Sequence, residues 1–93
     1  MGTDDLDSSQ VILADAGFIT GVMVYTDGVN DATLELYDNP IAASGVKPFK
    51  LTVSGADNYG GRIFQFPRKA FTGIYAVISG TGASYIVEYI QGG

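Results

Sequence analysis

Hydrophobic and polar residues alternate along seven short stretches of this chain, and Gly, Asn, Asp and Pro separate the stretches. Alternation with a period of two is typical of a half-buried β-strand, and no segment longer than a turn shows the helical period. The pattern is cleanest over residues 32–37, where every second residue is apolar. Strands are predicted over residues 10–15, 18–26, 32–37, 48–53, 62–66, 74–79 and 84–90.

The segments between these stretches carry turn residues. Asp27-Gly28 predicts a tight hairpin, Asp38-Asn39-Pro40 ends a strand, and Pro67 is expected to end another because it cannot donate to a ladder. Residues 68–72 then form a basic loop. Regularly spaced strands without helices predict one all-β domain over residues 10–93, an antiparallel β-sandwich (jelly-roll-like or a small barrel) of about seven strands. Residues 1–9 are polar and acidic, and we expect them to form a flexible arm.

Two of the predicted strands are apolar on both faces. Phe18, Val22 and Val24 oppose Ile19, Met23 and Tyr25 in one, and Tyr85, Val87 and Tyr89 oppose Ile86 and Ile90 in the other. Either loops cover these strands on both sides, or another subunit buries the outer side, as exposed apolar patches usually indicate. We favour the second reading. The expected subunit contacts are Ile19, Met23, Tyr25, Ile86 and Ile90.

Charge is unevenly distributed. The net charge is −5, which argues against a nucleic-acid partner, since a basic face is the usual footprint of phosphate binding. Residues 1–46 hold eight acids and no base, whereas every base lies between Lys47 and Lys69. The two halves either neutralise each other within one molecule, or an acidic patch meets a basic patch on a neighbouring copy. Arg68 and Lys69 are therefore further candidate contacts.

Composition narrows the chemistry. The chain has no Cys and no His, lacks a phosphate-binding glycine loop, and shows no apolar run long enough to cross a membrane and no signal-peptide pattern. We expect no enzyme activity, no cofactor, no metal and no membrane partner. Asp27, Asn30 and Asp31 crowd one turn as calcium ligands would, but Asp and Asn also dominate turns by bonding their own backbone, which we favour. Tyr37, Tyr59 and Tyr75 are candidates for an aromatic sugar-binding face.

Most of the predicted domain resembles small structural proteins of tailed bacteriophages. The resemblance rests on residues 31–39 (DATLELYDN), 42–45 (AASG), 49–53 (FKLTV), 64–67 (FQFP), 73–77 (GIYAV) and 80–83 (GTGA). It implies a virion protein made in the host cytoplasm, either a capsid decoration (cement) protein or a neck or tail accessory protein. Such proteins associate through sheet faces and loops. The expected partners are further copies of this chain, with a trimer favoured because capsids offer threefold positions, and the major capsid or another virion protein. A carbohydrate- or host-surface-binding module is the remaining alternative.

Overall fold

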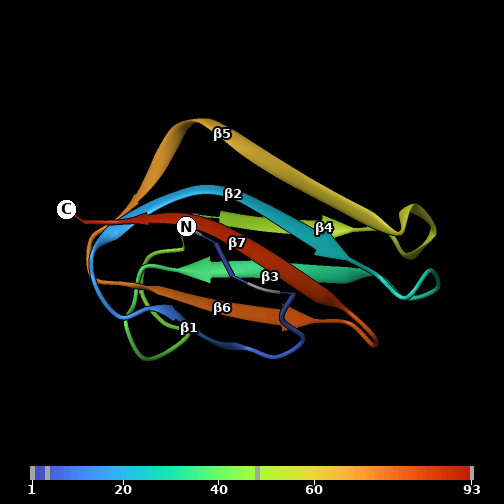
Figure 1. Cartoon of the computed structure of the whole chain (residues 1–93). Coiled ribbons are helices and arrows are strands. Elements are labelled where there is room, and N and C mark those ends of the chain that lie inside the picture. The colour runs from blue at the N-terminus through green and yellow to red at the C-terminus, as the bar shows by residue number, and fades with distance from the viewer. Residues whose placement is uncertain (1, 4, 48, 93) are drawn as a thin grey trace.

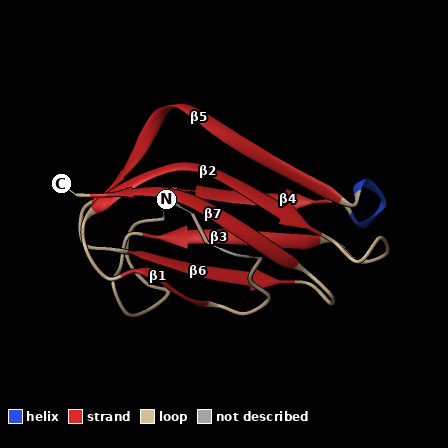
Figure 2. Cartoon of the chain, in the orientation of Figure 1, coloured by secondary structure: helices blue, strands red, loops and turns tan. Residues whose placement is uncertain are grey.

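The structure is a computed structural model that describes residues 2–3, 5–47 and 49–92, with Gln65 and Phe66 described at the backbone only. It is a sandwich of two antiparallel sheets, as Figures 1 and 2 show, which confirms the predicted fold class. The sheets have the orders β1-β6-β3-β4 and β5-β2-β7. The strands are β1 (Gln10–Leu13), β2 (Gly17–Tyr25), β3 (Ala32–Tyr37), β4 (Phe49–Val53), β5 (Tyr59–Ala70), β6 (Ile74–Ser79) and β7 (Ser84–Gln91), and a 3-10 turn, η1, spans Gly55–Asp57. No helix in the described part of the chain has the length and apolar character to span a bilayer.

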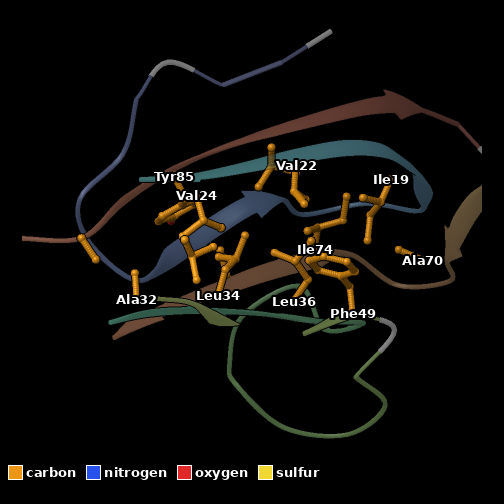
Figure 3. Packing of buried hydrophobic residues seen from close by; sticks show 14 residues of the cluster. Ile19, Val22, Val24, Ala32, Leu34, Leu36, Phe49, Ala70, Ile74 and Tyr85 are labelled. Carbon is orange, nitrogen blue, oxygen red and sulfur yellow. The ribbon is translucent and has the colours of Figure 1, made fainter. Parts of the chain in front are cut away.

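The core lies between the inward faces of the two sheets (Figure 3). Leu34 and Leu36 of β3 are fully buried in one cluster with Val24 and Val87 of the other sheet. Tyr85 of β7 is also fully buried, and its hydroxyl donates to the Ser8 carbonyl oxygen at 2.7 Å. Burial raises the pKa of Tyr85 to about 12. In the four-stranded sheet, the alternation of apolar residues in β3 places Leu34 and Leu36 together on the inward face.

At the start of β2, the side chains point to the faces opposite to those predicted. Its register against β5 and β7 shifts between Ile19 and Gly21, which is a β-bulge at Thr20. An extra residue reverses the alternation, so Ile19 points inward with Val22 and Val24 and is 0% exposed. Phe18 takes the outward direction instead. The prediction that Ile19 contacts another subunit is therefore wrong, because the sandwich itself covers this side chain.

Strand β5 also differs from the prediction. It runs through Pro67 to Ala70, so Arg68 and Lys69 belong to a strand and not to a loop. Gly21 pairs with Ile63 while Ile19 pairs with Arg68, so the intervening residues of β5 leave the ladder, and Figure 1 shows the strand arching away from β2. Proline is tolerated here because β5 lies at a sheet edge, where a missing N–H breaks no ladder.

The N-terminal residues lie along the outer edge of β7. Gly2 and Leu6 form isolated bridges with Glu88 and Tyr85, and the amides of Leu6 and Tyr85 donate to each other's carbonyl oxygens at 2.8 Å. Through these contacts, Gly2 and Leu6 extend the three-stranded sheet beyond β7. That residues 1–9 form a flexible arm stays a prediction, and Met1 and Asp4 lie outside the described residues.

Candidate interaction surface

The outward face of the three-stranded sheet is built from rows of side chains that share one direction. Residues paired across antiparallel strands lie on the same face, so the register alone defines each row. The rows are Lys69–Phe18–Ile90, Ile63–Gly21–Glu88, Gly61–Met23–Ile86 and Tyr59–Tyr25–Ser84. Apolar groups occupy most of these positions. We call this surface the apolar face.

A groove of about 530 Å³ lies in the apolar face. Its lining includes Gly21, Met23, Ile63 and Ile86, and Thr20 and Glu88 contribute polar atoms. Gly21 contributes to its shape, because it adds no side chain to the row of Ile63 and Glu88. A Cβ on Gly21 would lie 3.2 Å from the Arg62 carbonyl oxygen, so the backbones of β2 and β5 approach closely there. At Gly61, beside the groove, a Cβ would lie 3.0 Å from the Met23 sulfur, because the Met23 side chain covers this glycine.

Cations cover aromatic rings along β5. The Lys69 ammonium lies 4.6 Å from the centre of the Phe18 ring and 5.9 Å from that of Phe71. The Arg68 guanidinium lies 5.2 Å from the Phe64 ring, which in turn packs edge-on against Phe49 of the core. Cation–ring contacts hold charged groups over apolar surface. The edge of the apolar face formed by β5 is therefore basic.

Most of the residues predicted as subunit contacts lie on this surface. Met23, Tyr25 and Ile86 line the groove, and Ile90 is 54% exposed beside Phe18. Lys69 borders the same face over Phe18. Arg68 precedes Lys69 in β5, pairs with the inward-facing Ile19 and covers the Phe64 ring, so it does not share the apolar face. Ile19 is withdrawn into the core.

Two positions of the groove were missed by sequence reasoning: Gly21 and Ile63. A glycine inside an otherwise apolar strand often marks a bulge or a close approach of another group, and this signal was present at Gly21. Ile63 was assigned to a strand, but its exposure depends on the position of β5 at the edge of the sheet. That position is set by the pairing of β5 with the distant strand β2.

The outward face of the four-stranded sheet differs, because polar groups of β3 and β4 bond to one another there, beside Tyr37, Tyr75 and Val77. Glu35 of β3 forms an ion pair with Lys47 and lies opposite Lys50 of β4, and Thr33 and Thr52 share a hydrogen bond of 3.0 Å. The hydrogen bond from Lys47 holds the pKa of Glu35 below its usual range. At this pair, an acid from the first half of the chain and a base from the second neutralise each other within one molecule. This is the first of the two arrangements expected from the uneven charge distribution.

The three tyrosines proposed as a sugar-binding face do not gather. Tyr37 and Tyr75 pair across β3 and β6, with the Lys47 ammonium 5.3 Å from the centre of the Tyr37 ring. Tyr59 begins β5 in the other sheet and is 63% exposed. The structure therefore brings together two of the three rings.

Carboxylates in the turns bond to backbone amides. Asp27 accepts from the N–H groups of Asn30 and Val29 at 2.7 and 2.9 Å, and these bonds lower its pKa. Burial raises the pKa of Asp38, but the N–H groups of Phe71 and Thr72 outweigh it and hold the pKa below its ordinary value. Across the ranges that the structure describes, no three acidic side chains gather as metal ligands would.

The apolar face thus gathers exposed apolar side chains and a groove on one side of the sandwich. Comparison with known protein families, with curated proteins and with solved structures finds no match to this chain.

Proposed function

We propose that this chain is a non-enzymatic structural protein of a bacteriophage particle that decorates the capsid as a small homo-oligomer. The observation that carries the proposal is the apolar face, where Met23, Tyr25 and Ile86 surround a groove on the outside of a sheet. The virion setting is supported by the resemblance of about residues 18–90 to tailed-phage structural proteins. The trimer expected from threefold capsid positions belongs to this proposal as a prediction.

The free energy gained by burying apolar surface favours self-association through a sheet face. Burying apolar surface contributes about 25 cal/mol per Å², and a stable interface covers about 800 Å² of each partner. Much of that gain is offset by the freedom lost on association, so the quality of the contact decides the affinity. An apolar face with a preformed groove provides such a contact because few side chains need to be reordered.

The self-association is tested by sedimentation equilibrium of the full chain from about 1 μM to about 100 μM, a range that brackets micromolar dissociation constants. We expect an oligomer that persists at high salt, because burial of apolar surface is not screened as exposed charges are. A species that stays monomeric throughout this range contradicts the proposal.

The place in the particle is tested separately, by quantitative mass spectrometry of purified particles that contain this chain. A decoration protein covers the shell and is expected at a copy number comparable with that of the major capsid protein. A copy number far below it would instead favour the neck or tail, where a protein forms a single ring. Absence from purified particles contradicts both positions.

A further inference from the structure

We propose that the groove of the apolar face accepts the Ile63 side chain of a second copy of this chain. The inference rests on the proposed self-association and names the contact that would produce it.

Ile63 is the protruding half of this contact. Its side chain is 93% exposed, the largest exposed fraction among the large hydrophobic side chains that the structure describes. It lies on the edge strand β5, immediately before the segment that arches away from β2. Each buried aliphatic side chain of this size is a substantial part of an interface, so an isoleucine displayed on a sheet edge is well placed as an anchor.

The groove is the receiving half. Gly21 leaves part of its floor without a side chain, while Met23 and Ile86 form apolar walls. Its volume of about 530 Å³ falls within the range of sites that enclose other molecules. An aliphatic side chain entering from outside would therefore meet apolar walls and displace water from them.

The two halves lie side by side, which makes the surface self-complementary. Ile63 pairs directly with Gly21 in the ladder, so the protrusion and the floor occupy one row. A two-fold axis parallel to the strands and between β2 and β5 places each Ile63 over the Gly21 of the other copy. In a ring of three, Ile63 of each copy would instead enter the groove of the next copy. Each copy then forms this contact once as the donor of Ile63 and once as the owner of the groove.

Charge on the rim favours a second copy of this chain as the occupant. Arg62 of β5 and Glu88 of β7 both line the groove, on strands that flank β2. The two-fold arrangement moves the β7 of one copy to the outer side of β5 in the other. Glu88 of each copy then approaches the strand that carries Arg62 of the groove and Lys69 of the apolar face, which is electrostatically favourable.

The test compares Ile63→Asp with Ile41→Asp by sedimentation equilibrium of the full chain. Ile41 is 78% exposed in the loop after β3, so its variant makes the same chemical change outside the apolar face. Both side chains are exposed, so both variants are expected to fold, and circular dichroism checks this. We expect Ile63→Asp to raise the Kd of self-association by at least about a hundredfold and Ile41→Asp to leave it within about threefold.

A conservative variant separates the contact from a general effect of mutation at this position. Ile63→Val keeps a branched aliphatic group and is expected to associate nearly as the wild type does. If the wild type associates and Ile63→Asp associates equally well, this contact is wrong while the proposed function stands. If the wild type does not associate at any concentration, both are contradicted. Equal loss in Ile63→Asp and Ile41→Asp also overturns the contact.

Discussion

The outward faces of the two sheets differ although their inward faces form one core. On the four-stranded sheet, Glu35 pairs with Lys47 and Thr33 with Thr52, so polar groups satisfy each other in the monomer. On the three-stranded sheet, Met23 and Ile86 flank a groove, and Ile63 protrudes beside it. Under the proposed self-association, water is a sufficient neighbour for one face, whereas the other gains free energy when a second copy covers it.

The largest expected effect comes from the core that both sheets share. Leu34→Ala in the four-stranded sheet and Ile19→Ala in the three-stranded sheet each remove a side chain that is 0% exposed. Each is expected to lower the free energy of unfolding by about 2–5 kcal/mol, measured by urea denaturation, because a cavity remains between the sheets. The matched control is Ile90→Ala on the apolar face, which should change the stability of dilute protein by less than about 0.5 kcal/mol. Similar losses in Ile19→Ala and Ile90→Ala would show that the bulge does not turn Ile19 inward.

The next effect concerns the polar contacts that join β3 to the β5–β6 loop. Asp38→Ala removes an acceptor from the N–H groups of Phe71 and Thr72, which donate at 2.9 and 2.8 Å. We expect a loss of about 1–2 kcal/mol at neutral pH, measured by urea denaturation. Asp38→Asn keeps one acceptor oxygen and should lose less.

The same residue makes a prediction about pH. The pKa of Asp38 is lowered in the folded state, so the stability from its ionised form is present above the ordinary aspartate pKa of about 3.9. That contribution is lost as the pH falls through the lowered folded-state pKa, and the difference between wild type and Asp38→Ala should then shrink. A difference that stays constant from neutral pH to about pH 2 would contradict the role of the ionised carboxylate.

The ion pair on the polar face should matter less. Glu35→Gln is expected to cost about 1 kcal/mol or less, and added salt should reduce the difference, because both partners are partly exposed. Thermal unfolding at low and high ionic strength measures this. A cost above that of Asp38→Ala would mean that the polar face depends on this pair far more than its exposure indicates.

The smallest effect concerns the N-terminal row beside β7. We expect the Leu6 amide to exchange hydrogen for deuterium much faster than the Val24 amide of central strand β2, because isolated bridges open locally without unfolding the sandwich. Equal protection of both amides in a residue-resolved exchange experiment would contradict the flexible arm.

Sequence alternation predicted most of the fold for a physical reason. Residues 32–37 and 74–79 were predicted and observed with the same bounds, because each of these strands has one inward face and a constant period of two. The facing of Ile19 was wrong because a bulge at Thr20 resets that period. The end of β5 was wrong because Pro67 lies on a sheet edge, and edge position is decided by pairing between distant segments.

The candidate surface was predicted in part for the same reason. Met23, Tyr25 and Ile86 follow an undisturbed alternation, so their shared face could be inferred. The groove between them depends on Gly21 of β2 lying opposite Ile63 of β5, a pairing between distant segments that local patterning does not register.

The most direct test of the difference between the two outward faces is a dilution series followed by amide NMR from about 1 mM to about 10 μM, a range in which a micromolar complex dissociates. Concentration-dependent shifts are expected at residues of β2, β5 and β7 around Met23, Ile63 and Ile86, while Thr33, Glu35 and Thr52 remain unchanged. Shifts that are absent, or that map to the face of Thr33 and Glu35, would contradict the central claim.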